Sequence, residues 1–389
     1  MISRMSAADE SDARRPARLP LALVQRELVL ILMLCGVSAA LFAATRGLAE
    51  WARETSVATA AEWYARGEAL AETGANREAV TWLRRAANAD RGNLRYALML
   101  ARALAEAERA SEAQRILERL RETYPDNVEI NYRLARLHTA AGDDAAAVRH
   151  YNHAMYGLAS FGADYERWRI RMELIRFLLD RGDRDGAVAE LTALSRELPD
   201  TVGAHLAAAR LSLEAGDHQR ALAQFQLVRR LDPAHAEAAT GAGDAAYALG
   251  DYAQALTHWD AAATAGADLE LRRSQQLTAG AVLSRDPLAR GLSRAERARR
   301  LAGGLAWARA RLNGCAAAAA ISDPATAGAS LPDAVDALRQ RPAGVLSDPD
   351  TLSAGLALIL RVATAAAARC PSTDPVDQAW MLIARRAQA

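Results

Sequence analysis

The most hydrophobic stretch of the chain is Leu28–Ala44, seventeen residues without a charge. A helix of this length, at about 1.5 Å of rise per residue, lies at the short end of the range that crosses a bilayer. The residues before it are polar and include two prolines, which disfavour regular structure. We therefore predict a polar tail over residues 1–27 and a transmembrane helix over residues 28–45.

The same apolar stretch has two other interpretations. A buried core helix needs a covering partner, and no nearby segment is suited to supply one. A cleaved signal peptide would have an unusually long polar region before its apolar core, and no clear Ala-x-Ala cleavage site follows. The uncleaved anchor is favoured over both.

The arginines around this anchor indicate its orientation. Five precede the apolar stretch, whereas only Arg46 and Arg53 follow it within ten residues. Arginine-rich flanks tend to stay on the cytoplasmic side. We therefore predict a single-pass protein of the bacterial inner membrane, with its N-terminus in the cytoplasm and the chain after residue 45 in the periplasm.

Beyond residue 60 the pattern changes to one that repeats every 34 residues. Gly-Asp pairs begin at Gly142, Gly182, Gly216 and Gly250; the last three are 34 residues apart, and the first step is 40. Glycine in a turn can take positive φ, and the aspartate after it can cap the next helix. A period of this length is typical of stacked helical repeats.

The repeat resembles the tetratricopeptide repeat, a 34-residue helix–turn–helix unit. Six units are predicted, at about residues 60–93, 94–127, 128–161, 168–201, 202–235 and 236–269. The consensus positions hold Trp63, Gly67, Gly74, Ala79, Leu83 and Ala86 in the first unit, and Gly243, Gly250, Tyr252, Ala255, Trp259 and Ala262 in the sixth. The chain departs from the pattern at Glu108, where glycine is expected, and in the extra residues 162–167.

The resemblance implies an all-α fold and a binding groove. The fold would be a right-handed superhelix over residues 60–269, after the transmembrane helix and before a helical C-terminal domain or cap at 270–389. In the family, the first helix of each unit lines the concave groove. Its fifth and ninth positions supply the candidate groove residues, which are Tyr64, Arg102, Tyr132, Arg136, Met172, Arg176 and Arg210.

Four successive arginines at the ninth position would form a ladder along that groove. Guanidinium groups bind carboxylates bidentately, so the resemblance implies a protein or peptide ligand, with acidic segments among the candidates. The alternative is local neutralisation by acids four residues on, at Glu106, Asp180 and Glu214. Only Arg136 lacks such a partner.

The composition argues against most catalytic chemistry. All 48 basic residues are arginine, and without lysine the chain cannot build a P-loop, a Schiff-base site or a pyridoxal-phosphate site. A net charge of +1 gives no reason to expect nucleic acid as a partner. His150 and His153 have metal-binding spacing, but no acid or cysteine completes a set, so a solvated pair is favoured. We predict no catalytic residue, no cofactor and no metal, and hence no enzyme.

Beyond residue 270 the period fades, but helices are still expected. One begins at Ser293, with Glu296 completing a capping box, and others cover residues 332–341, Pro349–Arg369 and the stretch after Asp374. Residues within Pro349–Arg369 are apolar enough to span a membrane, but an arginine at the middle makes that costly. A buried helix is favoured.

Cysteines and charges set this C-terminal segment apart. Cys315 and Cys370 each end a predicted helix, and outside the cytoplasm they could pair; two free buried thiols are the alternative. The segment has 16 arginines and 10 acidic residues, and eight of the arginines lie within Arg285–Arg311. Residues 46–269 have 27 arginines and 33 acidic residues. Either the segment packs on the acidic array as a cap, or it binds an anionic partner such as lipid headgroups or a glycan.

These features predict a membrane-anchored protein-binding scaffold, or an assembly or chaperone-like factor, at the bacterial envelope. The alternative is a component of a polysaccharide synthesis, export or secretion complex. An enzyme in the C-terminal segment has no motif to support it.

Overall fold

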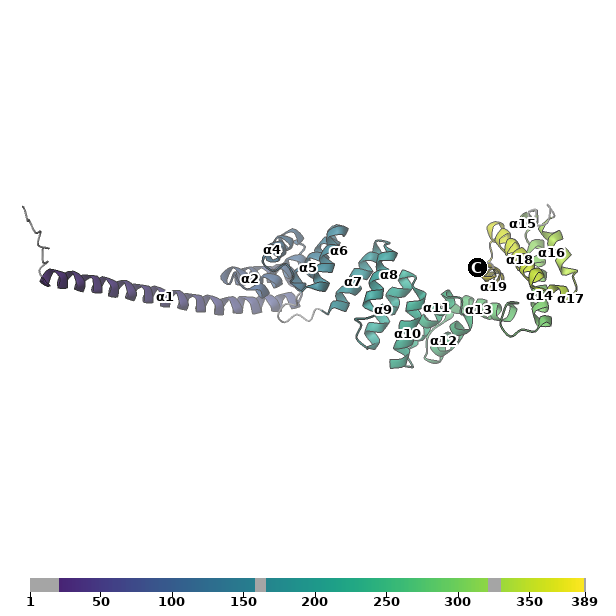
Figure 1. Ribbon diagram of the computed structural model, residues 1–389, viewed down its shortest axis with the longest axis horizontal. Coiled ribbons are helices and arrows are strands. Elements are labelled where there is room, and N and C mark those ends of the chain that lie inside the picture. The colour runs from purple at the N-terminus through teal and green to yellow at the C-terminus, as the bar shows by residue number, and fades with distance from the viewer. Residues whose placement is uncertain (1–20, 158–165, 321–329, 388–389) are drawn as a thin grey trace, which may run out of the picture. The chain divides into compact units, whose positions relative to one another are not determined.

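The computed structural model describes residues 21–157, 166–320 and 330–387 (Figure 1). Most of the predicted polar tail, and most of the extra residues 162–167, lie outside these ranges. The chain forms two compact units that divide after Phe161.

The first unit contains six helices among its described residues. They are α1 (Leu21–Glu72), α2 (Asn76–Ala89), α3 (Leu94–Glu106), α4 (Ala110–Thr123), α5 (Val128–Ala141) and α6 (Asp144–Tyr156). Consecutive helices pack against each other, so α1 and α2, α3 and α4, and α5 and α6 form three antiparallel pairs. These pairs match the first three predicted repeats.

The second unit contains the remaining repeat helices and, after them, the helices of the C-terminal segment. Its repeat helices are α7 (Arg167–Asp180), α8 (Arg184–Leu194), α9 (Val202–Ala215), α10 (His218–Leu231), α11 (Ala236–Ala248) and α12 (Tyr252–Thr264). The C-terminal segment follows as η1 (Glu270–Arg272), α13 (Arg273–Arg285), α14 (Arg294–Asn313), α15 (Ala316–Ala319), α16 (Leu331–Arg339), α17 (Ala343–Leu346), α18 (Pro349–Arg369) and α19 (Pro375–Arg386). The predicted all-α repeat fold is confirmed.

Helix α1 is longer than the sequence pattern indicated. It begins at Leu21, inside the predicted polar tail, and runs without a break through the apolar stretch into the first repeat. No proline interrupts it after Pro20, and the hydroxyl of Thr45 bonds to the carbonyl oxygens of Leu41 and Phe42, both at 2.9 Å, without breaking the helix. None of the apolar segment Leu28–Leu48 is buried in the structure.

The turns between paired helices explain the 34-residue period. Gly142 ends α5 with φ +75°, a left-handed conformation that glycine adopts without strain. Asp143, next in the chain, accepts the backbone N–H of Ala146 and caps α6, as predicted. Glu108 occupies the equivalent turn with φ +64°, so the turn geometry persists even where the consensus glycine is missing.

Small residues let the paired helices approach closely. At Gly243, an added Cβ would lie 2.4 Å from the indole of Trp259 on the partner helix. That distance leaves no room for a side chain, and Trp259 is completely buried. The eighth position of the repeat is therefore small because the large residue of the second helix occupies its space.

Three consecutive repeats bury a polar pair between their two helices. The partners are nineteen residues apart each time: Asn131 with His150 at 3.2 Å, Arg171 with Glu190, and His205 with Gln224 at 2.7 Å. His150 is only 4% exposed, so the prediction of a solvated histidine pair was wrong for this residue. Its ring fills the space between α5 and α6, where Asn131 can satisfy it.

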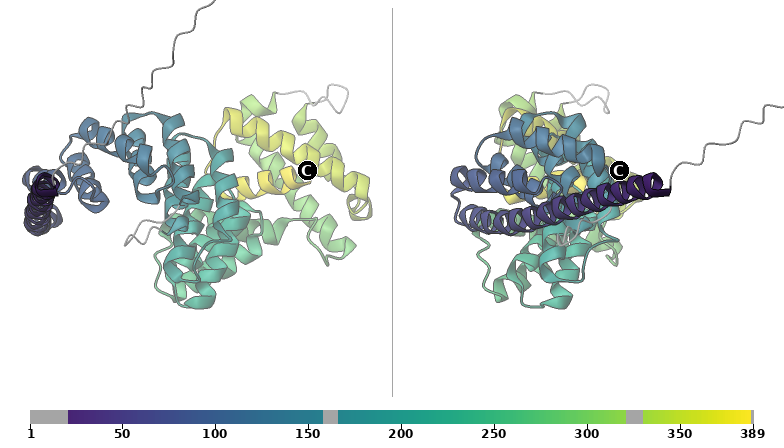
Figure 2. Two further views of the ribbon diagram at one scale, coloured as in Figure 1. Left: turned by 60° about the vertical axis from the view of Figure 1, so that its left-hand side comes forward. Right: turned by 90° about the vertical axis from the view of Figure 1, so that its left-hand side faces the viewer.

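The C-terminal helices share one hydrophobic core with the last repeat. Trp259 of α12, Leu305 of α14, Ile359 of α18 and Trp380 of α19 belong to the same buried cluster. Helix α13 packs on α12 and also on α19, which returns from the C-terminal end (Figure 2). Helices α13 and α19 thus form a seventh pair whose members are far apart in sequence.

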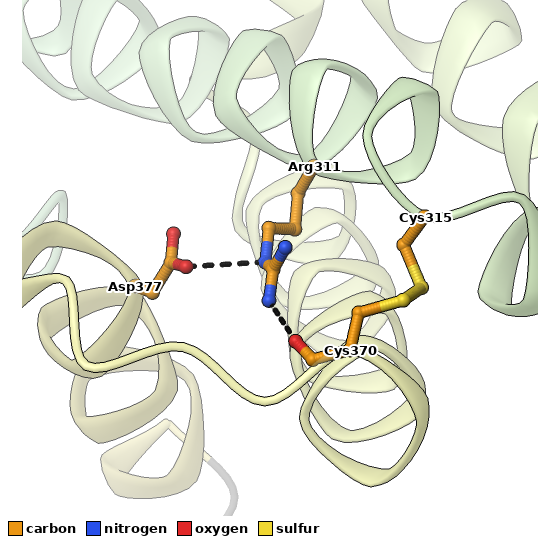
Figure 3. The surroundings of a disulfide bond; sticks show 4 residues. All are labelled: Arg311, Cys315, Cys370 and Asp377. Atoms are coloured by element: carbon orange, nitrogen blue, oxygen red, sulfur yellow. Dashed lines mark hydrogen bonds and ion pairs between the residues drawn. A yellow bond between two sulfur atoms is a disulfide. The ribbon is translucent and has the colours of Figure 1, made fainter.

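A disulfide closes the loop that contains α15–α18 and joins the end of α14 to the end of α18 (Figure 3). Cys315 and Cys370 are bonded across a Cα–Cα distance of 6.1 Å, and Cys315 is 1% exposed. Arg311 lies beside the bond, donates to the carbonyl oxygen of Cys370 and pairs with Asp377 at 3.1 Å. The indole N–H of Trp307 donates to the same carboxylate at 2.7 Å. This cluster ties α14 to the start of α19.

Candidate functional site

The groove candidates differ in how far they are available to a ligand. Tyr64 is 7% exposed, Tyr132 and Met172 are half-buried, and the four arginines are exposed. Tyr64, Arg102, Tyr132 and Arg136 belong to the first compact unit, and Met172, Arg176 and Arg210 belong to the second.

Tyr64 joins the first repeat to the second. Its ring stacks on Tyr96 with centroids 4.8 Å apart, and its hydroxyl donates to Glu68 at 2.7 Å and accepts from Arg95 at 3.0 Å. Burial, followed by the hydrogen bond to Glu68, raises the pKa of Tyr64. Both the ring and the hydroxyl group of Tyr64 therefore already have partners within the protein, which leaves little of either for a ligand.

Two ninth-position charges form ion pairs with the next part of the chain, Arg210 with the following repeat and Asp244 with the start of the C-terminal segment. Arg210 binds Glu237 of the next repeat through two bonds of 2.6 Å, and this contact lowers the pKa of Glu237. Asp244 binds Arg272 at 2.9 Å in the same way, with the charges reversed. The expected local partner of Arg210, Glu214, is not its bidentate partner, because Glu237 presents both oxygens to the guanidinium fork.

Arg102 is neutralised within its own helix. Its Nε donates to Glu106 at 2.9 Å, as the local alternative predicts. Both side chains are exposed, so this pair contributes little to stability but reduces the positive charge that a ligand would meet.

Arg176 is the ninth-position arginine of the second unit that has no close carboxylate partner. Its side chain is 60% exposed, and the carboxylate within ion-pair distance is Glu214 at 4.0 Å rather than the expected Asp180. The position that supplies Glu237 to Arg210 is Gly203 in the repeat after Arg176, and Gly203 has open space around it. The guanidinium of Arg176 therefore keeps most of its donors free.

Arg136 is the ninth-position arginine of the first unit that has no carboxylate partner among the described residues. Its guanidinium carbon lies 5.9 Å from the ring centre of Tyr132, a loose cation–π contact. Within the described part of the chain, no carboxylate lies within ion-pair distance of Arg136. The predicted ladder of four arginines therefore reduces to two with free binding capacity, Arg136 and Arg176.

Two groups of buried polar residues were missed by sequence reasoning. The pairs at the fourth and twenty-third repeat positions include Arg171, which is 2% exposed. His258 accepts from Arg229 at 2.7 Å, and its pKa is lowered by burial and by that arginine. Aligning these two positions across all repeats would have found the first group. In the described residues, no group of three or more His, Cys, Asp or Glu side chains could hold a metal.

Family models of the tetratricopeptide repeat match residues 70–126 and 104–156, and again residues 172–236 and 206–270. These matches fall on the helix pairs described above. The chain is a tetratricopeptide repeat protein. Because arrays of this repeat bind proteins or peptides and are generally not enzymes, this tetratricopeptide repeat protein has an interaction or assembly role.

Several solved structures resemble this tetratricopeptide repeat protein in fold. The C-terminal part of a repeat protein from Cytophaga hutchinsonii is 12% identical with a TM-score of 0.44, covering 61% of this chain and 92% of its own. PilW, described as a widely conserved type IV pilus biogenesis factor, is 17% identical with a TM-score of 0.38, covering 51% and 90%.

YrrB, described as having an unusual peptide-binding site, is also 17% identical with a TM-score of 0.38, covering 51% of this chain and 97% of its own. Among curated proteins, none matches this tetratricopeptide repeat protein significantly.

Proposed function

We propose that this protein is a membrane-anchored scaffold of the bacterial envelope that captures an acidic segment of a partner protein. The span would be residues 28–45, the N-terminus would lie in the cytoplasm, and the array would lie in the periplasm. The observation that carries the anchoring is the unbroken helix α1, whose segment Leu28–Leu48 is wholly unburied.

The groove chemistry rests on the two arginines that the array leaves uncompensated. Arg102 and Arg210 are held by Glu106 and Glu237, so they have little left for a ligand. Arg136 and Arg176 lie at the same repeat position without a close partner: Arg136 has no ion pair among the described residues, and Glu214 is 4.0 Å from Arg176. A carboxylate from another chain would bind these guanidinium groups as Glu237 binds Arg210.

Replacing Arg136 and Arg176 with alanine tests the groove. Each substitution should weaken binding of a labelled Asp- and Glu-rich peptide by about threefold to tenfold, because each removes one charge-assisted contact. Arg102→Ala is the matched control: it removes the same charge from an arginine already neutralised, so binding should change little. Equal losses in all three variants would contradict the assignment.

Topology is tested by fusing alkaline phosphatase to the C-terminus. The enzyme is active only outside the cytoplasm, so the proposed orientation requires an active fusion. An inactive fusion would place the array in the cytoplasm. The mass of the mature protein decides separately between an uncleaved anchor and a cleaved signal peptide.

The second candidate is a component of a polysaccharide synthesis, export or secretion complex. Its support is that Arg285, Arg290, Arg294 and Arg297 make no ion pair within the described residues. Such a role requires that deletion of the gene alters glycan release, whereas a general protein scaffold requires that crosslinking in intact membranes recovers a protein partner.

A further inference from the structure

A cleft in the C-terminal segment lies apart from the groove candidates. It has a volume of about 570 Å³ and is formed by residues at the end of α13, along α14 and near the start of α19. Its wall carries Arg285, Arg299, Arg300, Gly303, Trp307 and Trp380. We call it the arginine–tryptophan cleft. Its volume is within the range of small-ligand and peptide-anchor sites.

The charges of this cleft are unbalanced. Three guanidinium groups meet one carboxylate, that of Glu296. Arg300 bonds to Glu296 at 2.8 Å and also donates to the carbonyl oxygens of Leu283 and Asp286, so it closes the end of α13. Arg300 therefore has a structural role.

The other two arginines keep free donors. Arg299 shares the carboxylate of Glu296 with Arg300, and its side chain is 79% exposed. Arg285 donates to the hydroxyl of Ser284 at 3.1 Å and has no ion pair among the described residues. Arg285 and Arg299 are therefore the groups that can bind an anion.

The acceptors of the cleft each already accept a hydrogen bond from an arginine. Glu296 accepts from two arginines, and the carbonyl oxygens at the end of α13 accept from Arg300. The hydroxyl of Ser284 accepts from Arg285 and donates to the carbonyl oxygen of Ala281 at 3.2 Å. Each of these acceptors is thus already bonded to an arginine, whereas Arg285 and Arg299 keep donors free, and this balance suits a carboxylate better than the donating hydroxyl groups of a glycan.

The apolar part of the cleft comes from two indoles. Trp307 stacks on Trp380 with ring centres 6.1 Å apart, and Trp380 is buried. Trp307 is half-buried and its N–H is already bonded to Asp377, so what it presents is carbon surface. An apolar side chain beside a carboxylate would cover this surface.

We propose that the arginine–tryptophan cleft binds an acidic peptide segment, with its carboxylate on Arg285 and Arg299 and an adjacent apolar side chain on Trp307. The site lies on helices outside the groove candidates. It gives the C-terminal segment a binding role in addition to covering the last repeat, and it does not depend on the groove being used.

Binding is measured with the full chain in detergent micelles, by fluorescence anisotropy of a labelled peptide of alternating Asp and Leu. All variants carry Arg136→Ala and Arg176→Ala, so that groove binding does not contribute. The matched Asn–Leu peptide should bind at least tenfold more weakly, because neutral amides lose the charge-assisted contacts. A uronate hexasaccharide is the competing probe.

Two substitutions remove the charge and two matched ones control for it. Arg285→Gln with Arg299→Gln should weaken peptide binding by about tenfold, whereas Arg290→Gln with Arg294→Gln, which line no part of this cleft, should leave it within about twofold. Equal weakening by both pairs would reduce the effect to general charge and overturn the proposal. Tighter binding of the uronate than of the peptide would also overturn it.

A steric variant keeps the test independent of charge. A Cβ at Gly303 meets no atom within 4 Å, so Gly303→Gln fills the cleft without removing any contact. Gly280 of α13 has the same open surroundings and lies outside the cleft, so Gly280→Gln is its control. The proposal requires that the first abolishes peptide binding and the second does not.

Discussion

The repeat array and the C-terminal segment assemble helices in opposite ways. Within α1–α6 and within α7–α12, each helix packs mainly on its neighbours in sequence. In the C-terminal segment, α13 packs on α19, and Thr278 meets Gln378 across 100 residues of chain. Both arrangements bury a helix pair, but only the array closes its pairs through short turns.

This difference determines what each region needs for stability. Short turns cost little loop-closure entropy, so a repeat is held by its neighbours and by its own small-residue contacts. A pair closed over a long loop requires further restraint, and the C-terminal segment has one in Cys315–Cys370. The two regions should therefore respond differently to the same kind of perturbation.

Removal of the disulfide should have the largest effect. Cys315→Ser with Cys370→Ser opens a loop with a sequence separation of 55 residues. The chain-entropy model gives a loss of about 4 kcal/mol in the free energy of unfolding of the C-terminal segment. Amide hydrogen exchange should show protection lost in α14–α19 and retained in α7–α10. Cys35→Ser, at the exposed free cysteine, is the control, and a loss spread evenly over the chain would contradict the distinction.

Adjacent glycines of α14 offer a sharper comparison. A Cβ at Gly304 would lie 2.7 Å from both Ile359 and Trp380, whereas one at Gly303 meets nothing. Gly304→Ala should lower the free energy of unfolding of the C-terminal segment by about 1–3 kcal/mol through overpacking. Gly303→Ala should raise it by up to about 1 kcal/mol through helix propensity. Urea midpoints measure both; equal shifts would mean that the core of this segment is loosely packed.

Mild acid should weaken the array and spare the C-terminal segment. All seven histidines lie in the array, between His138 and His258. Burial, together with the nearby Arg121, lowers the pKa of His150 to about 4. Because the folded pKa is below the unfolded one, this stability is complete above about pH 6.5 and is lost as the pH falls toward 4.

The expected loss at about pH 5 is on the order of 1–2 kcal/mol for His150 alone. His150→Gln should remove this pH dependence while retaining an amide that can bond to Asn131. The measurement is amide hydrogen exchange of the array helices as a function of urea, at each pH. Exchange times are adjusted so that the intrinsic exchange rates match between the pH values. If the C-terminal segment lost stability first, carboxylates and not histidines would control the acid response.

The repeated part of the fold was predictable because its signals are local. Gly142 and Asp143 specify a turn and a cap within two residues, and the three units that follow repeat the same Gly-Asp pair. Pairings across long distances had no such signal. Nothing near α13 indicates that its partner is α19, because that pairing depends on the whole intervening segment packing first.

The groove itself stays a prediction, and the sequence indicated the positions of its candidate arginines but not their charge balance. The fifth and ninth repeat positions identified Arg136 and Arg176, yet which arginines stay open depends on the next repeat. Glu237 neutralises Arg210, and Gly203 cannot do the same for Arg176. The continuation of α1 through residues 45–59 was missed for a similar reason, since the sequence pattern marked where the apolar stretch ended but contained no helix terminator.

The unbroken helix α1 has a geometric consequence for an anchored scaffold. The proposed span and the first repeat share one helix, which runs from Leu21 to Glu72. The rotation of the repeat about the helix axis is therefore set by the number of residues between the span and the repeat. Each added residue turns the repeat by about 100° and raises it by only about 1.5 Å. A partner fixed in the same membrane would meet a different side of the array after one insertion. An insertion of seven residues would bring the original side back to within about 20°.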